Sequence, residues 1–239
     1  MLEHNFVVVI PAHNEQSTIK QVIQAAIALY GCEVVVIDDA STDATARVAA
    51  DAGAVVLPLA IQLGVWGAIQ TGIRYALKRG YKTVVTMDAD GQHETVSIET
   101  LLAPIADESA DVVIGSFPIR ASRARRIAWS YFRLLTNLKL EDITSGFRAY
   151  NRTAMNLLAS PRLSLLDYQD IGVLLIARRK KLRLTEVSVT MRARQVGKSR
   201  VFDSWLTVAK YMFQTSLLCL ARIDFGSSYR PMRGRPVIR

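Results

Sequence analysis

The sequence lacks the features that mark a secreted or membrane-spanning protein. It has only two cysteines, Cys32 and Cys219, which lie far apart and outside any Cys-x-x-Cys or other metal-ligand spacing. The first residues lack the basic and then apolar stretches of an export signal. No segment has the roughly 18 or more uninterrupted apolar residues that a membrane span needs. We therefore expect a cytoplasmic protein in a reduced compartment, without structural disulfides.

Two common nucleotide-binding signatures are also missing. The sequence contains neither a Gly-x-Gly-x-x-Gly fingerprint nor a Gly-x-x-x-x-Gly-Lys-Ser/Thr phosphate loop. Their absence argues against a dinucleotide-dependent oxidoreductase and against a P-loop enzyme. Any phosphate handling would then depend on a metal ion and on arginine side chains.

Charge is distributed unevenly along the 239 residues. Residues 1–119 contain 6 Lys and Arg against 14 Asp and Glu, whereas residues 120–239 contain 24 against 7. A uniformly basic chain would suggest a nucleic-acid partner, which this pattern does not favour. An acidic half followed by a basic half instead indicates a cation site beside an anion-handling or membrane-facing surface.

Apolar runs alternate with amphipathic stretches through the first half of the chain. β-branched runs predict strands at 6–10, 33–37, 55–57, 83–87 and 111–114. Helical spacing predicts helices at 15–30, 42–52, 65–79 and 96–105. Ser41 or Thr42 is the expected cap of the second helix. This alternation predicts an α/β fold with a mostly parallel central sheet flanked by helices.

The second half is less regular and ends in a basic segment. It predicts a basic amphipathic helix, a loop with a short strand, another helix, a strand and a polar loop at 120–138, 144–150, 167–179, 182–191 and 192–200. Trp205–Ala221 is expected to form an amphipathic helix with a polar stripe of Thr207, Lys210 and Gln214. We predict a catalytic domain at 1–203 and, at 204–239, an interfacial helix and basic tail on the inner face of the cell membrane. A helix that packs on the core or mediates dimers is the alternative.

Polar clusters follow three of the predicted strands. They are 11–15, 38–39 and 88–93, and the carboxyl ends of parallel strands are where ligands bind in open α/β sheets. Asp88 and Asp90, with Gln92 beside them, offer the oxygen ligands that Mg²⁺ or Mn²⁺ prefers. A solvated turn that caps the next helix is the competing interpretation.

The other two clusters are more ambiguous. Asp38 and Asp39 fit either a cap for a helix that begins near Thr42 or a contact with ribose hydroxyls. Asn14 and Glu15 fit either a binding loop or an ordinary helix start.

Five segments together resemble family 2 glycosyltransferases, in the order and spacing of that family. They are 10–15 (Ile-Pro-Ala-His-Asn-Glu), 36–41 (Val-Ile-Asp-Asp-Ala-Ser), 88–93 (Asp-Ala-Asp-Gly-Gln-His), 115–116 (Gly-Ser) and 145–148 (Ser-Gly-Phe-Arg). The resemblance covers about residues 6–200 and is strongest to the dolichyl-phosphate mannose synthase-like branch and its bacterial relatives. It implies a GT-A fold, a nucleotide sugar donor and inversion at the anomeric carbon.

The resemblance also implies roles for individual residues. Donor contacts are expected from Pro11, Ala12, Asn14, Glu15, Asp39, Asp88, Ala89 and Arg148. Asp88, Asp90 and Gln92 would bind Mg²⁺ or Mn²⁺ and the diphosphate, with Asp90 also counted as catalytic. A late basic loop would close over the donor and acceptor phosphates through Arg194, Lys198 and Arg200. Asp170 falls where relatives place a catalytic carboxylate.

Some positions depart from the family pattern or stay open. Phe117 stands where many relatives carry arginine, and Arg120 or Arg123 is the candidate substitute. His93 is expected to support the metal site or start a helix rather than bind the ion. Trp66 either borders the donor, as its loop does in relatives, or packs in the core.

The predicted activity is transfer of a sugar from a GDP- or UDP-linked donor to a polyprenyl phosphate or a membrane-associated glycan. A glycan hydroxyl would need Asp170 as a general base, whereas a phosphate acceptor is already anionic. A sugar-1-phosphate nucleotidyltransferase is an alternative, although the first strand lacks the Gly-rich loop of that class. A non-catalytic, membrane-associated partner subunit is the other alternative.

Overall fold

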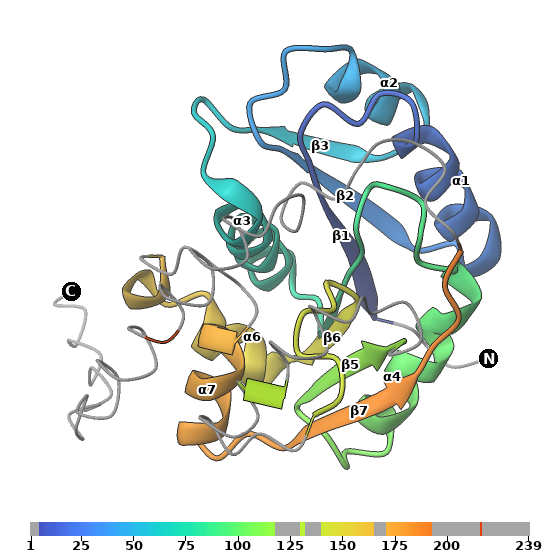
Figure 1. Ribbon diagram of the computed structural model, residues 1–239. Coiled ribbons are helices and arrows are strands. Elements are labelled where there is room, and N and C mark those ends of the chain that lie inside the picture. The colour runs from blue at the N-terminus through green and yellow to red at the C-terminus, as the bar shows by residue number, and fades with distance from the viewer. Residues whose placement is uncertain (1–4, 118–129, 132–139, 165–170, 193–215, 217–239) are drawn as a thin grey trace, which may run out of the picture.

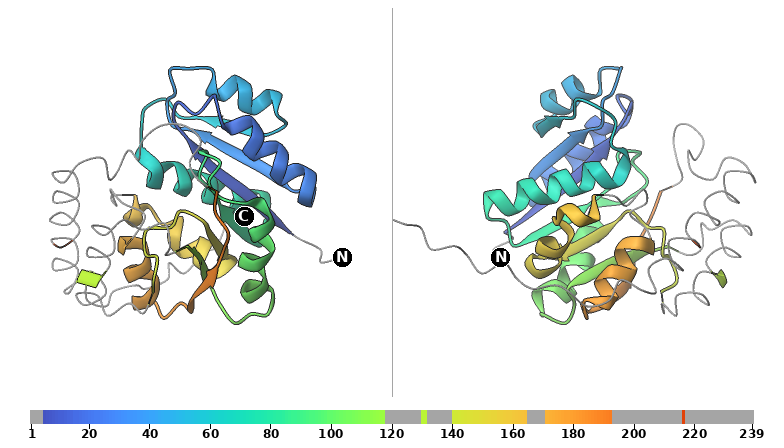
Figure 2. Two further views of the ribbon diagram at one scale, coloured as in Figure 1. Left: turned by 45° about the vertical axis from the view of Figure 1, so that its right-hand side comes forward. Right: turned by 90° about the vertical axis from the view of Figure 1, so that its left-hand side faces the viewer.

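The protein is described by a computed structural model that covers residues 5–117, 130–131, 140–164, 171–192 and 216. A seven-stranded sheet lies between two layers of helices (Figures 1 and 2). The strands are β1 (Phe6–Ala12), β2 (Glu33–Asp38), β3 (Val55–Pro58), β4 (Thr83–Thr86), β5 (Val112–Ser116), β6 (Arg148–Asn151) and β7 (Leu184–Ser188). The helices are α1 (Ile19–Tyr30), α2 (Thr45–Asp51), α3 (Gly64–Arg79), α4 (Ile98–Ala106), α6 (Arg152–Leu158) and α7 (Ile171–Arg179), with single turns η1 (Thr95–Ser97) and η3 (Pro161–Leu163).

The strands follow the order β3-β2-β1-β4-β6-β5-β7. β1, β2, β3 and β4 pair in parallel, as do β5 and β7. β6 lies antiparallel between β4 and β5 and joins the two parallel parts. The predicted mostly parallel sheet is confirmed. Its parallel strands end at one edge, which carries the polar clusters found in the sequence.

The core fills the space on both faces of the sheet. Alternate residues of β1 point to opposite faces: Val7 and Val9 pack with α3, α6 and α7, whereas Val8 and Ile10 pack with α1, α2 and α4. These strand residues are fully buried. Parallel strands that are covered on both sides read as continuous apolar runs, which explains why β1 and β2 lack an alternating polar pattern.

Several element boundaries differ from the sequence prediction. β1 extends through Pro11 and Ala12, which the sequence placed in a loop. α1 begins four residues later than predicted because residues 15–18 form a turn, closed by the Glu15 carbonyl. The helix α6 was not predicted.

The predicted cap of the second helix is wrong. The N-cap position of α2 is Ala44, which makes no side-chain cap hydrogen bond. Ser41 instead accepts a hydrogen bond from the backbone N–H of Asn14 through its Oγ, at 3.0 Å. Asp43 accepts the N–H of Thr45 at 2.9 Å and so supports the first turn of α2 from outside the cap position.

Two predicted helices fall largely outside the described residues. They are 120–138 and 205–221, of which only residues 130–131 and 216 are described, and the boundary after residue 203 lies in the same undescribed stretch. In the described part of the chain, no helix combines the length and the apolar character needed to cross a membrane.

Asp111 ties the last strands of the sheet together at the edge opposite the polar clusters. Its carboxylate accepts hydrogen bonds from the backbone and guanidinium of Arg183, at 2.8 to 3.1 Å, and from the amide of Asn151 at 2.8 Å. The hydrogen bonds from the Arg183 side chain lower the pKa of Asp111 to about 2, against burial, which raises it. The charged form is therefore favoured by folding.

A pKa that is lower in the folded state gives stability that is present above the unfolded pKa and is lost as the pH falls through the folded pKa. We therefore expect the free energy of unfolding of the wild type to exceed that of Asp111→Asn at pH 5. This difference should shrink between about pH 4 and pH 2. Urea unfolding of both proteins across this range measures it, and a difference independent of pH would contradict the assignment.

Candidate active site

The loops after β1 and β2 are joined by the side chain of Asn14. Asn14 has a positive φ of 55°, a conformation that asparagine tolerates better than most residues. Its Oδ1 accepts the backbone N–H groups of Thr42 and Asp43, at 2.8 and 3.3 Å. Glu15 adds a bond from its own N–H to the hydroxyl of Thr45, at 2.8 Å. The two predicted donor-binding loops are thus joined by hydrogen bonds into one unit at the carboxyl edge of the sheet.

Asp39 anchors the amino terminus of α3. Its carboxylate accepts the N–H of Leu63 at 2.6 Å and that of Gly64 at 2.9 Å, and the side chain is buried. These N–H groups have no partner within the helix, so a buried carboxylate satisfies them and complements the helix dipole. One prediction from the sequence was that Asp39 caps the helix near Thr42. Asp39 instead accepts hydrogen bonds from the amino terminus of α3. Its predicted contact with the nucleoside stays a prediction.

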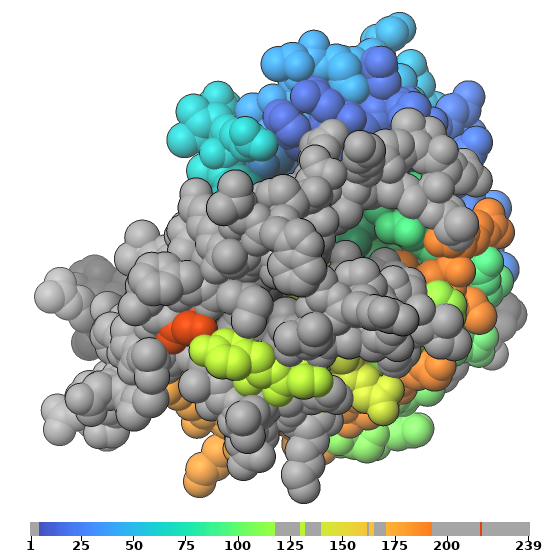
Figure 3. All heavy atoms as spheres, viewed as in Figure 1, coloured from blue at the N-terminus to red at the C-terminus, as the bar shows by residue number. Residues whose placement is uncertain are grey.

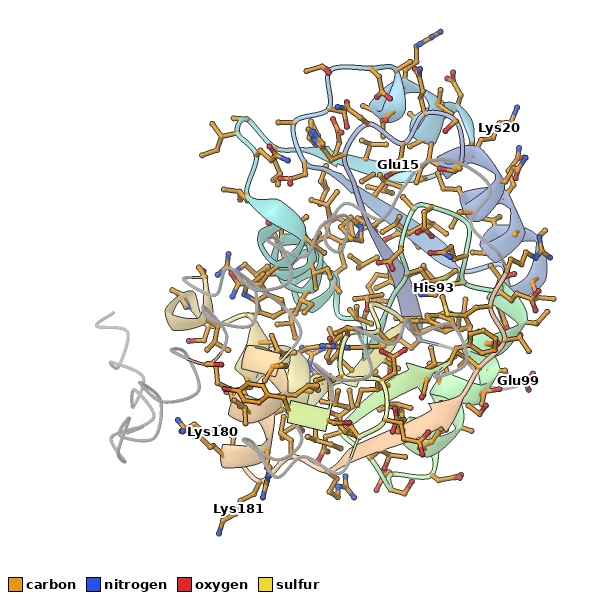
Figure 4. All side chains as sticks on the ribbon, viewed as in Figure 1. Glu15, Lys20, His93, Glu99, Lys180 and Lys181 are labelled. Carbon is orange, nitrogen blue, oxygen red and sulfur yellow. The ribbon has the colours of Figure 1, made fainter. Side chains whose placement is uncertain are left out.

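His13, for which the sequence suggested no role, belongs to the same unit. Its Nδ1 lies 2.7 Å from the backbone oxygen of Asp39, and its Nε2 lies 3.3 Å from the amide nitrogen of Asn14. The ring therefore links the loop after β1 to the loop after β2. Figure 4 shows Glu15 on the loop that leaves β1 and His93 on the segment that follows β4.

The turn after β4 brings two carboxylates to the surface at the centre of the sheet. Met87 continues the strand and is fully buried, whereas the side chain of Asp88 is 37% exposed. Asp90 is partly exposed, and its Oδ1 accepts the N–H of Gln92 at 3.0 Å, which holds the turn closed. Gly91 has a φ of +75°, which a side chain would strain.

Gly146 lies directly against the carboxylate of Asp88. A Cβ atom at this position would come within 2.5 Å of Oδ1 and 3.0 Å of Oδ2. The hydroxyl of Thr86, the last residue of β4, donates to the carbonyl of Gly146 at 2.7 Å. The loop before β6 is thus fastened to the end of β4, and only glycine leaves room there for the carboxylate. The Ser-Gly-Phe-Arg motif was recognised in the sequence, but no role was predicted for its glycine.

Arg148 and Ala89, both predicted to contact the donor, are buried. The Arg148 guanidinium donates to the carbonyls of Ser145 and Ile143, at 2.8 and 3.0 Å, and the side chain has no exposed surface. Ala89 is 4% exposed and packs in the core beside α1 and α4. The predicted contact of Arg148 with a donor stays a prediction. Through these two hydrogen bonds, the arginine holds the loop that contains Gly146.

The donor set at the end of β4 fits a divalent cation that keeps other oxygen ligands. Among the residues that the structure describes, no group of three or more His, Cys, Asp and Glu side chains could by itself hold a metal ion. Asp88 and Asp90 supply hard carboxylate oxygens, and Gln92 is partly exposed beside them. Mg²⁺ and Mn²⁺ commonly bind one or two carboxylates and complete their shell with water and phosphate oxygens. These residues suit an ion that arrives with a diphosphate.

The sequence model of glycosyl transferase family 2 matches residues 7–159, which include all of these loops. The chain belongs to this family. It is a glycosyltransferase, and the family resemblance noted in the sequence is confirmed.

Curated relatives of this glycosyltransferase place it in the branch that the sequence indicated. The chain is 30% identical over 210 residues to an undecaprenyl-phosphate mannosyltransferase of Micrococcus luteus, covering 81% of this chain and 86% of the relative. It is 28% identical over 250 residues to a polyprenol monophosphomannose synthase of Mycolicibacterium smegmatis, covering 97% and 91%. A UDP-N-acetylglucosamine–dolichyl-phosphate N-acetylglucosaminyltransferase of Methanococcus voltae is 27% identical over 210 residues, covering 76% and 83%.

Solved structures support the fold of the glycosyltransferase. Glucosyl-3-phosphoglycerate synthase from Mycobacterium tuberculosis, in complex with Mn²⁺ and uridine-diphosphate-glucose, superimposes with a TM-score of 0.72 at 22% sequence identity. The match covers 92% of this chain and 80% of the other. The predicted GT-A fold is confirmed.

The structure also decides between the two interpretations of Trp66 in this glycosyltransferase. Trp66 is buried, and its indole N–H donates to the carbonyl of Leu163 at 2.7 Å. Gln70, one turn later on the same face of α3, donates to the carbonyls of Leu158 and Ser160. Trp66 is therefore a core residue that holds the segment after α6 against α3.

Several predicted site residues lie outside the described part of the chain. They are Asp170, Arg194, Lys198, Arg200 and the possible arginine substitutes Arg120 and Arg123. Their roles stay predictions.

Proposed function

We propose that this glycosyltransferase moves a sugar from a nucleotide diphosphate sugar to a polyprenyl phosphate, with Mg²⁺ or Mn²⁺ and with inversion at the anomeric carbon. The observation that carries the proposal is the pair of surface carboxylates, Asp88 and Asp90, at the end of the central strand β4. They lie at the same sheet edge as the loops built around Asn14 and Asp39. A nucleoside on those loops would place its diphosphate toward β4.

The protein groups would divide the work along this edge. The loops of Asn14 and Asp39 would hold the nucleoside, and the two carboxylates with Gln92 would hold the ion. When bound, the ion would stabilise the negative charge that develops on the departing nucleoside diphosphate. The predicted basic loop with Arg194, Lys198 and Arg200 would bind the acceptor phosphate by charge-assisted hydrogen bonds. The acceptor would attack from the face opposite the leaving group, which inverts the anomeric carbon.

A phosphate acceptor is favoured over a glycan by the relatives. Undecaprenyl phosphate and dolichyl phosphate appear in the names of two of them. A phosphate oxygen is already anionic at neutral pH, so the reaction would need no strong general base. With a phosphate acceptor, Asp170 would orient the acceptor or the cationic side chains that bind it. With a hydroxyl acceptor, Asp170 would have to accept a proton.

A screen of nucleotide sugars tests the proposed function. Purified protein is incubated with GDP- and UDP-linked sugars and Mn²⁺ or Mg²⁺, and the release of nucleoside diphosphate is measured with and without polyprenyl phosphate. We expect release that requires the metal and rises strongly with the lipid phosphate. Release that rises only with a glycan would correct the acceptor, and pyrophosphate release from a nucleoside triphosphate would favour a nucleotidyltransferase.

We also propose that the enzyme contacts the membrane through the loop between β3 and α3 and the first turn of α3. Ile61, Leu63 and Val65 are 67%, 49% and 49% exposed, and no charged residue occurs between Asp51 and Arg74. Figure 3 shows this cyan part of the chain at the outer edge of the molecule. Three exposed aliphatic side chains are too few for a stable protein interface, which needs roughly 20–30 residues per side, but they suit shallow insertion into lipid.

A pair of substitutions tests this contact. Ile61→Glu/Val65→Glu is expected to weaken binding to neutral phosphatidylcholine vesicles about tenfold, because two inserted aliphatic groups are replaced by charges. The matched control is Leu29→Glu/Val96→Glu, which changes two exposed aliphatic residues on α1 and η1. Vesicle flotation at high salt measures both. If the two variants bind vesicles equally, this loop is not the membrane contact, and the predicted helix at 205–221 is the remaining candidate.

A further inference from the structure

His93 occupies a buried position between three parts of the chain. Its side chain has no exposed surface, although the residue follows a surface turn. The imidazole stacks on the ring of Phe147, with centroids 4.8 Å apart and planes inclined by 16°. The backbone of His93 forms a β-bridge with Met191. These contacts fix both the place and the plane of the ring.

The hydrogen bond of the imidazole to Asp88 determines its tautomer. The backbone N–H of Asp88 donates to Nδ1 of His93 at 3.1 Å, so Nδ1 acts as an acceptor. In a neutral imidazole, one nitrogen accepts and the other carries the proton, so the proton lies on Nε2. Nε2 is 3.7 Å from Oδ2 of the Asp88 carboxylate. One residue therefore holds both the backbone and the side chain of Asp88.

Gly146 limits Asp88 from another direction. A Cβ at Gly146 would come within 2.5 Å of Oδ1 and 3.0 Å of Oδ2, and the imidazole faces Oδ2. The space left by Gly146 and the polar N–H near Oδ2 together favour one orientation of the carboxylate. Such support helps a metal ligand, because a carboxylate that is already held in one rotamer loses less conformational entropy when the ion binds.

We propose that His93 is a positioning residue which, as the Nε2–H tautomer, orients the Asp88 carboxylate for a divalent cation. This inference rests on the proposed function, since it assigns Asp88 to the cation site. At 3.7 Å the N–H makes an electrostatic contact rather than a full hydrogen bond. The contact favours one orientation of the carboxylate and leaves its oxygens able to bind an ion.

Two substitutions separate the two nitrogens of the ring. The terminal group of asparagine reaches the position of Nδ1, and that of glutamine reaches the position of Nε2. His93→Asn therefore keeps an acceptor for the Asp88 N–H but has no donor toward the carboxylate. His93→Gln keeps an N–H near Oδ2. A histidine that only satisfied the backbone and filled the core would be replaced better by asparagine.

Affinity for Mn²⁺, measured by electron paramagnetic resonance with GDP or UDP present, decides between these roles. We expect His93→Asn to bind Mn²⁺ at least about tenfold more weakly than the wild type, and His93→Gln to stay within about threefold. Melting temperatures show that both variants are folded. Equal affinities, or weaker binding by the glutamine variant, would overturn the proposal.

The tautomer can be measured without any metal. Nitrogen-15 NMR of the imidazoles distinguishes the two protonated nitrogens, and the chain has three histidines, so the signal missing in His93→Gln identifies His93. We expect Nε2 to carry the proton in the metal-free protein, and a proton on Nδ1 would overturn the inference. Absence of Mn²⁺ binding by the wild type would instead contradict the proposed function, and the two failures are therefore distinguishable.

Discussion

Replacement of Asp90 by asparagine is expected to reduce metal-dependent release of nucleoside diphosphate by about a thousandfold. The change removes one negative charge from the pair of carboxylates at the end of β4. Asparagine has nearly the same size, and its Oδ1 can still accept the N–H of Gln92 that closes the turn. The fold should therefore survive while the affinity for a divalent cation is lost.

The experiment compares turnover, Mn²⁺ affinity and melting temperature in Asp90→Asn and in Asp51→Asn. Asp51 is exposed at the end of α2 and lies outside the proposed site, so its variant controls for the loss of one charge. If the protein were a partner subunit without catalytic activity, the wild type itself would show no donor turnover. Unchanged turnover of Asp90→Asn would remove the basis of the proposed cation site.

Replacement of Gly146 by alanine is expected to lower kcat/KM about a hundredfold with little change in melting temperature. The new methyl group would lie 2.5 Å from Oδ1 of Asp88, so the carboxylate must move. Asp88 is partly exposed and can rotate toward solvent, which costs the fold little. A displacement of about 1 Å at a catalytic centre can cost about a hundredfold in rate.

Gly72→Ala is the matched control for Gly146→Ala. A Cβ at Gly72, in α3, would approach Cγ1 of Val9 to 2.3 Å, but Val9 lies in the core and away from the carboxylates. Overpacking there should destabilise the fold by about 1–3 kcal/mol. Gly146→Ala is thus expected to lose activity and keep its stability in urea unfolding. Gly72→Ala is expected to show the opposite pattern. A Gly146→Ala protein that loses stability but binds Mn²⁺ normally would contradict the contact with Asp88.

The sequence predicted the parallel part of the fold well because its signals are local. Continuous β-branched runs marked β1 to β5, and helical spacing marked α1 to α4 between them. The short helix α6 was not predicted, although Asn151 caps it by accepting the N–H of Ala154. The antiparallel insertion of β6 could not be predicted, since strand order depends on packing rather than on local pattern.

The candidate site shows the same division between local and long-range information. Asp88 and Asp90 could be located from a short motif that follows a strand. The burial of Arg148, the support of α3 by Asp39 and the contact of Gly146 with Asp88 depend on residues far apart in the chain. A sequence motif indicates that such residues matter, but it does not say whether they contact a ligand or one another.

The antiparallel strand β6 makes the centre of the sheet depend on contacts between residues that are far apart in the chain. The hydroxyl of Thr86 and the carbonyl of Gly146 that it binds are 60 positions apart, so this contact costs more chain entropy to close than a local one. The loops around Asn14 and Asp39, by contrast, are joined by contacts within the first half of the chain. The proposed cation site therefore depends on a segment that is distant in the sequence, whereas the loops around Asn14 and Asp39 depend on contacts within the first half of the chain.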